Sequence, residues 1–542
     1  MLLVLDCPFL IHLRYRNKGR GTLALLLKFQ PHKSWHDMTR SPAGKICMVI
    51  GEGNSAQLEK AILKTKPKAN YLELRLDYLK VSDLTVSNLR KWVRLGEVPV
   101  IATLRRKANG GEFAGTEAEQ MEILKGAVEA NVAFLDVEIE TIENYLHGEF
   151  TLLKKSPTRL IASYHNFEET PASLESIYLR LLQVKPDVLK IATLARSFSD
   201  NLRLLELIER TRKQDLSIIA VAMGELGVYS RIVGPSRGAL LTYGSMGKET
   251  APGQPSVYDL NHVYALDEID EETRFYGVIG YPVGHSLSPH IHNAAFRERG
   301  LNARYLPFPI QDLQDFSPYL KRLGGFSITI PHKVAILRYV DQLDSTAKMT
   351  GAANTLVKHG DDLWAYNTDV HGIRYALRKP LEEGIHQATL LGAGGAARSA
   401  AIVLKEANCQ VTVLGRDPKK TRSFADEFGF ECDSLCQAAK YRGDLLINAT
   451  PLGMSPGIEQ TPLLDENSIR YRYVFDMVYN PLETRLMRQS RGKAAAIGGI
   501  EMFVAQAAKQ FELWTGLEPP RELMRKIVLE KLHASNRLAP QL

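Results

Sequence analysis

The chain has 542 residues, of which 45% are hydrophobic and 24% are charged. This composition is typical of a globular protein rather than of a disordered or membrane-spanning chain, and the length favours two to four domains. The net charge of +7 gathers in residues 1–45, which hold eight Lys or Arg and two Asp. The rest of the chain is therefore close to neutral, which disfavours a nucleic-acid-binding surface.

Residues 1–44 differ from the rest of the chain, because they are basic, poor in acids and made of short apolar pieces broken by charge. A transit peptide is one interpretation, but serine is sparse and no small-residue cleavage pattern comes after an uninterrupted apolar core. We favour an extension without a fixed structure, or a start codon assigned too early, with Met38 or Met48 nearer the true start. The expected location is cytoplasmic, with the plastid as the alternative if this segment is a transit peptide.

The cysteines form neither a CxxC pair nor an evenly spaced framework. They are Cys7, Cys47, Cys409, Cys432 and Cys436. We therefore expect reduced thiols in a cytosol-like compartment and no metal site.

From Lys45 onward, short runs rich in Val, Ile and Leu alternate with amphipathic stretches. There are eight runs, the number that closes a parallel barrel of about 250 residues. The runs cover residues 45–51, 70–78, 98–105, 133–140, 159–167, 187–195, 217–224 and 238–245. The sequence therefore predicts an α/β protein that begins with a (β/α)8 TIM barrel.

Polar residues gather at the ends of these runs, and a barrel builds its active site at the carboxyl ends of its strands. The set comprises Glu73, Arg75, Asp77, Arg105, His165, Lys190, Arg231, Thr250 and Gln254. Lys190 stands out because it lies inside an otherwise apolar run, where an unpaired ammonium is costly. The alternative is a lysine that reaches the rim and a strand-end histidine with ordinary partners, and the convergence of so many polar strand ends disfavours it.

A lysine amine is a nucleophile only when it is neutral, and burial among cations favours that form. Arg75, Arg105 and Arg231 would provide such a field and also hold an anionic substrate. His165 could then move protons at neutral pH. The pattern predicts Schiff-base chemistry on a ketone, in which an imine helps an adjacent C–H proton to leave.

The segments ELRLD, SYHNF, DVLKIAT, MGELGVYSRIVG and TAPGQPS together resemble the type I 3-dehydroquinate dehydratases over roughly residues 45–265. The resemblance implies that Lys190 forms the imine with 3-dehydroquinate and that His165 is the general acid and base. It also implies substrate binding by Glu73, Arg75, Arg105, Arg231, Thr250 and Gln254. Two positions depart from the family pattern. Asn109 stands where a glutamate is common, and Thr250 replaces a serine but keeps the hydroxyl.

An acidic segment without a strong strand, residues 261–274, predicts a domain junction near Glu268. Beyond it, residues 275–296 are typical of a strand, a loop and the start of a helix. Ser286 and Ser288 lie in that loop, where serines either bind a ligand or only cap the helix.

A buried strand at residues 388–391 leads into Gly392, Gly394 and Ala397, which form a G-x-G-x-x-A pattern before a helix. The first glycine permits a tight turn, and the second lets a pyrophosphate approach the backbone. The next strand ends at Arg416, with two lysines close behind. Arginine there suits a 2′-phosphate and favours NADP over NAD, while the alternative is a solvated basic turn.

Reduction of a ketone creates an alkoxide, so a dehydrogenase needs a proton-handling group beside its substrate. Lys333 and Asp369 are the candidates, although each alone is more often a surface charge. The surrounding segments resemble the shikimate dehydrogenases over roughly residues 274–535, in the order of that family. They are GHSLSPHIHNAAF, ITIPHK, GAANTL, NTDVHGI, LGAGGAARS, NATPLGM, DMVYNPLETRLM and GGIEMFVAQAAKQFELWTG.

This second resemblance implies that Lys333 and Asp369 are the catalytic pair and that NADP(H) is the cofactor. For the substrate it implies Ser286, Ser288, Thr329, Asn354, Tyr479 and Gln506. For the cofactor it implies Gly392, Ala393, Gly394, Gly395, Ala396, Arg416 and Gly499. The basic turn that usually reads NRT is GRD here, and Asp417 would weaken the preference for NADP.

The product of the first activity is the substrate of the second, so the chain resembles the bifunctional dehydratase/dehydrogenases of aromatic amino acid biosynthesis. The expected partners are the small molecules 3-dehydroquinate and 3-dehydroshikimate, with no nucleic acid and no membrane, and the oligomeric state is left open. The expected domains are an extension (1–44), the barrel (45–268), a substrate-binding domain (269–378), a Rossmann domain (379–500) and C-terminal helices returning to the substrate-binding domain (501–542).

Two alternatives belong to other classes of function. A ligand-sensing regulator without catalysis would lack the reactive groups, yet Lys190, His165, Lys333 and Asp369 are all present. A quinate or quinate/shikimate dehydrogenase using NAD in the second half is disfavoured by Arg416.

Overall fold

The structure is a computed structural model that describes residues 45–65, 69–145, 156–246, 253–284, 286–463 and 468–538. The predicted extension at residues 1–44 and the predicted substrate-binding residue Thr250 lie outside the described residues.

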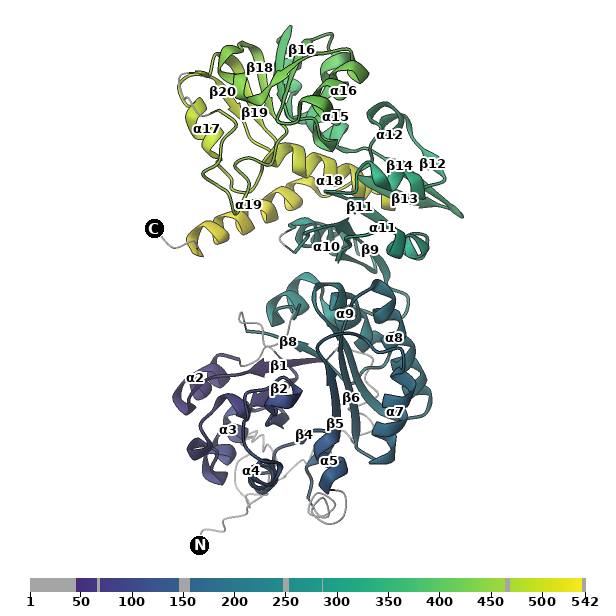
Figure 1. The fold of residues 1–542 in the computed structure, drawn as a ribbon, viewed down its shortest axis with the longest axis vertical. Coiled ribbons are helices and arrows are strands. Elements are labelled where there is room, and N and C mark those ends of the chain that lie inside the picture. Colours follow the sequence, from purple (N-terminus) through teal and green to yellow (C-terminus); the bar gives the residue numbers. More distant parts are fainter. Residues whose placement is uncertain are drawn as a thin grey trace, which may run out of the picture. The chain divides into compact units, whose positions relative to one another are not determined.

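The first part of the described chain is an eight-stranded parallel sheet that curls into a nearly closed barrel (Figure 1). Its strands pair in the order β7-β6-β5-β4-β3-β2-β1-β8. Leu240 N, just before β8, donates to Ile218 O of β7 at 2.8 Å, which brings the two ends of the sheet together. The strands are β1 (Ile46–Ile50), β2 (Tyr71–Arg75), β3 (Val100–Thr103), β4 (Phe134–Glu138), β5 (Arg159–Asn166), β6 (Val188–Leu194), β7 (Ser217–Met223) and β8 (Thr242–Gly244). The eight runs predicted from the sequence and the barrel fold are thus confirmed.

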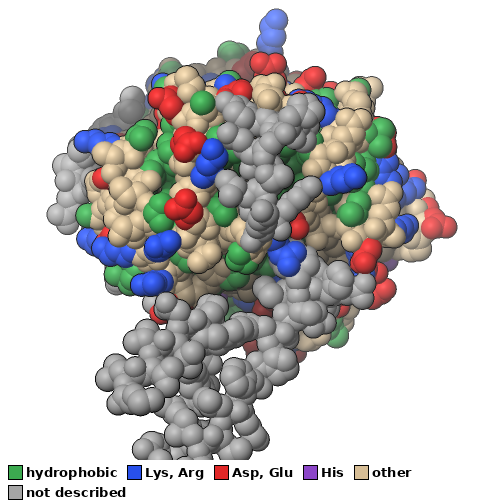
Figure 2. All heavy atoms as spheres, turned by 90° about the horizontal axis from the view of Figure 1, so that it is seen from below, with side chains coloured by type: hydrophobic (Ala, Val, Ile, Leu, Met, Phe, Trp, Pro, Cys, Tyr) green, Lys and Arg blue, Asp and Glu red, His purple; other side chains and the backbone are tan. Residues whose placement is uncertain are grey.

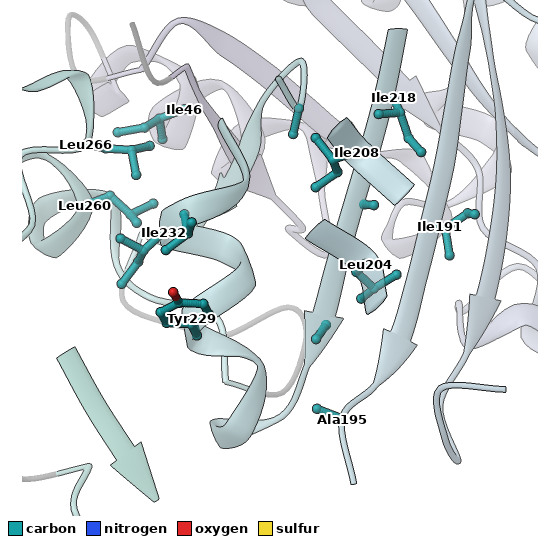
Figure 3. Packing of buried hydrophobic residues seen from close by; sticks show 14 of the residues in the cluster. Ile46, Ile191, Ala195, Leu204, Ile208, Ile218, Tyr229, Ile232, Leu260 and Leu266 are labelled. Atoms are coloured by element: carbon teal, nitrogen blue, oxygen red, sulfur yellow. The ribbon is translucent and has the colours of Figure 1, made fainter. Parts of the chain in front are cut away.

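Helices cover the outside of this barrel. They are α2 (Ser55–Thr65), α3 (Val86–Gly96), α4 (Glu117–Glu129), α5 (Ile139–Tyr145), α7 (Leu174–Gln183), α8 (Phe198–Lys213) and α9 (Val228–Arg237). Figure 3 shows Ile191 and Ile218 of the strands in one apolar layer with Leu204 and Ile208 of α8 and Ile232 of α9. Each such side chain contributes about 1.5–3 kcal/mol when fully buried, so this layer fixes the strands whose ends carry the polar residues.

Two further sheets come after the barrel in the chain (Figure 1). The first pairs in the order β10-β9-β11-β13-β14-β12, with antiparallel pairing of β13 to β11 and β14. The second is parallel in the order β17-β16-β15-β18-β19-β20, as expected for a Rossmann fold. The strands of the first are β9 (Arg274–Gly280), β10 (Ala303–Pro309), β11 (Gly325–Ile328), β12 (Gln342–Leu343), β13 (Thr355–His359) and β14 (Asp362–Tyr366). Those of the second are β15 (Gln387–Leu391), β16 (Gln410–Gly415), β17 (Glu431–Ser434), β18 (Gly443–Asn448), β19 (Tyr471–Asp476) and β20 (Ala495–Ile497).

The helices of this part include a long pair at the end of the chain. They are α10 (Ser288–Glu298), α11 (Leu313–Phe316), α12 (Ser345–Thr350), α13 (Asp369–Ala376), α14 (Arg378–Glu382), α15 (Gly395–Glu406), α16 (Pro418–Phe428), α17 (Arg485–Ser490), α18 (Ile500–Thr515) and α19 (Arg521–Leu538). Helix α18 comes after the second sheet in sequence but packs on α13 and reaches the first sheet, where Trp514 Nε1 donates to Leu356 O of β13 at 2.9 Å.

The surface of the described part carries charges of both signs. On the face seen in Figure 2, Lys and Arg side chains are interspersed with those of Asp and Glu over the described part. Among the described residues, no helix combines the length and apolarity needed to cross a bilayer, and no group of three or more His, Cys, Asp or Glu is arranged to hold a metal ion.

Candidate active sites

The carboxyl ends of the barrel strands surround a pocket. It brings together all of the described catalytic and substrate-binding residues that the first family resemblance implies, namely Glu73, Arg75, Arg105, His165, Lys190, Arg231 and Gln254. They come from β2, β5, β6, α9 and the loops that follow β3 and β8. Side chains on parallel strands meet at one rim because the strands point the same way.

Lys190 lies against two carboxylates and an aromatic ring. Its Nζ is 2.5 Å from Asp136 Oδ2 and 3.6 Å from Glu73 Oε1, and it lies 4.4 Å from the ring centroid of Tyr243. The lysine is buried, as its place in β6 predicts. Acidic partners therefore compensate the charge of Lys190, whereas the sequence predicts a field of arginines around it.

Two of the three arginines expected to supply that field, Arg75 and Arg105, are themselves paired with carboxylates. Arg105 donates to Asp136 Oδ1 at 2.7 Å and lies 3.3 Å from Glu138 Oε1. Arg75 forms a two-point hydrogen bond with Asp77, at 2.9 and 2.7 Å. These carboxylates orient the guanidinium groups and offset their charge, so the pocket is not simply cationic.

Asp136 of β4 was not predicted from the sequence, although it pairs with two of the residues predicted for this site. It is 1% exposed and joins Arg105 to Lys190 through its two oxygens. Burial acts to raise the pKa of Asp136, but the charges of Arg105 and Lys190 outweigh burial and hold that pKa well below its usual range. The sequence did contain a signal for Asp136, because an acid inside an apolar strand needs a buried cation as its partner.

His165 lines the same pocket as Lys190. It lies on β5, next to the strand that carries Lys190, and burial together with the charges of Arg105 and Lys190 lowers its pKa well below 6.5. Its Nδ1 is buried and has no hydrogen-bond partner among the described residues. An unpartnered ring nitrogen in a pocket can accept or return a substrate proton.

Asn109, where the first family resemblance leads one to expect a glutamate, also lines the pocket. Its Nδ2 donates to Glu140 Oε2 at 3.1 Å. The carboxylate next to Asn109 is therefore that of Glu140 in α5, and not one at position 109 itself.

A second constellation lies in the second half of the chain. Lys333, in the loop after β11, forms an ion pair and hydrogen bond with Asp369 Oδ2 at the start of α13. Asn354 Nδ2 donates to Asp369 Oδ1 at 2.8 Å and lies 3.3 Å from Gln506 Oε1 of α18. The structure therefore brings four of the predicted residues into direct contact.

The other predicted substrate residues have contacts of their own. Ser288 N donates to Ser286 Oγ at 3.3 Å where α10 begins. Thr329 N donates to Ile279 O of β9 at 2.9 Å, four residues before Lys333. The Tyr479 ring stacks on Phe503 of α18 at 4.1 Å between centroids.

The glycine-rich loop lies beside Lys333. Gly392 has a φ of +104° and follows β15, while Gly394 and Gly395 begin α15, ahead of Ala396. A Cβ at Gly395 would lie only 3.2 Å from Lys333 Cδ, whereas one at Gly394 would meet nothing within 4 Å. The open backbone at the helix N-terminus suits a pyrophosphate, and it lies beside Lys333.

Two other predicted cofactor positions also have a structural explanation. Ala393, between the first two glycines, packs against the apolar core of the second sheet. Gly499 approaches the backbone of Met477 so closely that a Cβ would clash with the Met477 carbonyl.

Local contacts explain Gly415 and Asp417, the two residues of the GRD turn that depart from the family pattern. Arg416 follows β16 and is exposed, whereas Asp417 Oδ1 accepts from Lys419 N at 2.9 Å and Lys420 N at 3.1 Å as the N-cap of α16. A Cβ at Gly415 would overlap Thr421 Oγ1. Asp417 is thus engaged by the helix, which leaves Arg416 as the charged side chain of the turn.

Comparisons with known proteins agree with this geometry. The profile of type I 3-dehydroquinase matches residues 46–271, that of the shikimate dehydrogenase substrate-binding domain matches 278–356, and that of the shikimate 5′-dehydrogenase C-terminal domain matches 499–529. A bifunctional 3-dehydroquinate dehydratase/shikimate dehydrogenase of Arabidopsis thaliana, described as chloroplastic, is 33% identical over 91% of this chain and 85% of its own length. The chain belongs to this bifunctional family.

The second half of this bifunctional enzyme also matches separate proteins. The NADP(+) shikimate dehydrogenase of Bacillus anthracis is 40% identical over 48% of this chain and 99% of its own length. A crystal structure of the Thermus thermophilus shikimate 5-dehydrogenase with NADP(H) and shikimate is 33% identical over 47% of this chain and 99% of that chain, with a TM-score of 0.44. The chain thus joins a lyase domain to an oxidoreductase module, as the sequence predicts.

Proposed function

We propose that the barrel dehydrates 3-dehydroquinate to 3-dehydroshikimate through an imine on Lys190, and that the second module reduces 3-dehydroshikimate to shikimate with NADPH. The observation that supports the first step most strongly is the buried Lys190, with its Nζ 2.5 Å from Asp136, in a pocket it shares with His165. The two steps are consecutive, because the product of the first is the substrate of the second.

In the barrel, the Lys190 amine gives up its proton and attacks the substrate ketone, and loss of water from the carbinolamine leaves a protonated imine. The imine withdraws electrons from the neighbouring carbon. His165 is neutral, so it can remove a proton from that carbon and return it to the departing hydroxyl, which leaves as water. Hydrolysis of the imine regenerates the Lys190 amine. Arg75, Arg231 and Gln254 hold the substrate's carboxylate and hydroxyls.

In the second module, the residues present fit a dinucleotide. Gly392 adopts a left-handed φ that favours glycine, the start of α15 is open at Gly394, and Arg416 is exposed for a 2′-phosphate. When bound, NADPH supplies the hydride for the ketone carbon. Lys333 donates the proton to the alkoxide oxygen while its ion pair with Asp369 holds the ammonium in place, and Asn354 and Gln506 orient the substrate hydroxyls.

For the compartment, we propose a reducing one. The described cysteines, Cys47, Cys409, Cys432 and Cys436, are free thiols. The cytoplasm is our prediction and the plastid its alternative, which the chloroplastic relative supports. Imaging the chain fused to a fluorescent protein, with and without residues 1–44, distinguishes the two.

A coupled assay tests the proposed function on the intact chain. 3-Dehydroquinate and NADPH are supplied together, and NADPH oxidation is followed with wild type, Lys190→Ala and Asp369→Asn. We expect Lys190→Ala to oxidise NADPH only when 3-dehydroshikimate is added directly. Asp369→Asn should accumulate 3-dehydroshikimate. Full coupled activity in either variant would contradict the proposed function.

A further inference from the structure

A buried chain of hydrogen bonds ends at the proposed catalytic pair Lys333–Asp369. It begins at Tyr305 of β10, whose hydroxyl donates to Ser327 Oγ at 2.6 Å, and Ser327 Oγ donates to Gln510 Oε1 at 2.9 Å. Gln510 lies on α18, one turn beyond Gln506, and is 2% exposed. This chain of hydrogen bonds connects α18 to strands β10 and β11.

Beyond Gln510 the chain of hydrogen bonds continues to Asp369. Gln510 Nε2 donates to the main-chain oxygen of Asn354 at 3.1 Å and to Thr355 Oγ1 at 3.0 Å. Thr355 Oγ1 donates to Asn354 Oδ1 at 2.7 Å, and Asn354 Nδ2 donates to Asp369 Oδ1 at 2.8 Å. Four contacts therefore link the Gln510 amide to the catalytic carboxylate.

The direction of these bonds is fixed by their partners. Asn354 Oδ1 also accepts from Thr368 N at 2.7 Å, so a main-chain donor holds this oxygen and the amide nitrogen must face Asp369. In the same way, Gln510 must present its nitrogen to the Asn354 carbonyl and its oxygen to Ser327. Asp369 thus receives one donor on Oδ1, which turns Oδ2 toward Lys333.

From this geometry we propose that Gln510 is a positioning residue for reduction, acting through Thr355 and Asn354 on Asp369. This inference rests on the proposed catalytic role of Lys333 and Asp369. Gln510 does not touch Lys333 or Asp369 but holds Asn354, so its loss should alter how Asp369 is held and, because Asn354 also orients a substrate hydroxyl, raise KM for 3-dehydroshikimate. A misplaced carboxylate slows a proton transfer that needs close alignment.

The chain offers a matched control for a test. Gln489 of α17 is likewise buried, at 5% exposure, accepts from Thr461 Oγ1 at 2.8 Å and donates to Leu463 O at 3.2 Å. Gln510→Met and Gln489→Met therefore each remove one buried amide of the same module. Only the first removes a bond in the chain to Asp369.

The experiment measures 3-dehydroshikimate reduction by the intact chain. We expect Gln510→Met to lower kcat about 10- to 100-fold, with KM for NADPH within about threefold, and to shift the pH dependence of kcat. Gln489→Met should lose similar thermal stability while kcat stays within about twofold. Thr355→Val should reproduce the effect of Gln510→Met, and the double variant should be no slower than the slower single variant.

Three results would overturn the inference: a kcat and pH profile unchanged in Gln510→Met, an equal kcat loss in Gln489→Met, or additive losses in the double variant. Asp369→Asn, run in parallel, separates this inference from the proposed function. If Asp369→Asn reduces substrate at the wild-type rate, the catalytic pair itself is wrong. If only Asp369→Asn is slow, the pair stands and the role of Gln510 fails.

Discussion

Lys190 of β6 and Asp136 of β4 form a buried ion pair with 2.5 Å between Nζ and Oδ2, although β5 lies between their strands in the sheet. The second oxygen of Asp136 accepts from Arg105 at 2.7 Å. One carboxylate therefore sets the position of both the proposed nucleophile and a proposed substrate-binding guanidinium.

Replacing Asp136 by Asn should remove the charge that holds these two cations while keeping the shape of the side chain. Breaking a buried pair leaves charge uncompensated and costs about 3–5 kcal/mol, so we expect some loss of stability as well. Dehydration by Asp136→Asn should fall at least about 100-fold. Reduction of 3-dehydroshikimate by the same sample is the internal control and should persist. A dehydration rate within a few-fold of wild type would show that Asp136 does not position Lys190.

The pH dependence of dehydration depends on His165. Burial and the charges of Arg105 and Lys190 lower its pKa well below 6.5, so the imidazole stays neutral as the pH falls from 7 through 6.5. The acid limb of kcat/KM should therefore lie below pH 6.5, with a plateau across neutral pH. Initial rates measured between about pH 5 and pH 8 check this. A half-maximal rate at or above pH 6.5 would assign the limb to another group or an ordinary histidine.

The cofactor preference should depend on Arg416 and not on Asp417. We expect Arg416→Ala to raise KM for NADPH about tenfold or more and to leave KM for NADH unchanged, because only NADPH carries the 2′-phosphate. Asp417→Ala removes the N-cap of α16 and should cost about 1 kcal/mol of stability without altering the preference. Steady-state kinetics with both cofactors, with a thermal melt of each variant, measure the two effects. A preference that depends on Asp417 would reverse this assignment.

The contact between the glycine-rich loop and Lys333 distinguishes two neighbouring glycines. In Gly395→Ala the new Cβ would lie 3.2 Å from Lys333 Cδ, so Lys333 must shift and kcat for reduction should fall about tenfold. Gly394→Ala meets no protein atom within 4 Å and should mainly raise KM for NADPH. Equal effects on kcat in both variants would mean that the loop does not act on Lys333.

Much of the fold and of the first site could be predicted from the sequence, because buried parallel strands produce apolar runs that are easy to recognise. All eight barrel strands lie within predicted runs, and Lys190 stands out by its conflict with its surroundings. Asp136 does not stand out in the sequence, because the alternation of acids with apolar residues in AFLDVEIE also fits a half-exposed strand. Its partners Arg105 and Lys190 lie 31 and 54 residues away, so only the pairing of strands distant in sequence brings them together.

Gln510 illustrates the same limit in the second half. In the stretch AQAAKQ, Gln506 and Gln510 both fit the polar stripe of an amphipathic helix. Their burial depends on strands much earlier in the chain, as the bond from Gln510 to Asn354, 156 positions apart in sequence, shows. Local pattern predicts the helix, while contacts between distant segments decide which face is buried.

The measurement that tests the central claim most directly is the covalent capture of the substrate on Lys190. The intact chain is mixed with 3-dehydroquinate, reduced with borohydride and digested, and the peptides are mapped by mass spectrometry. We predict that the ligand mass, fixed by reduction of the imine, is found on the peptide containing Lys190 and is lost in Lys190→Ala. An adduct on another lysine, or active dehydration by an enzyme that borohydride never captures, would contradict the Schiff-base account.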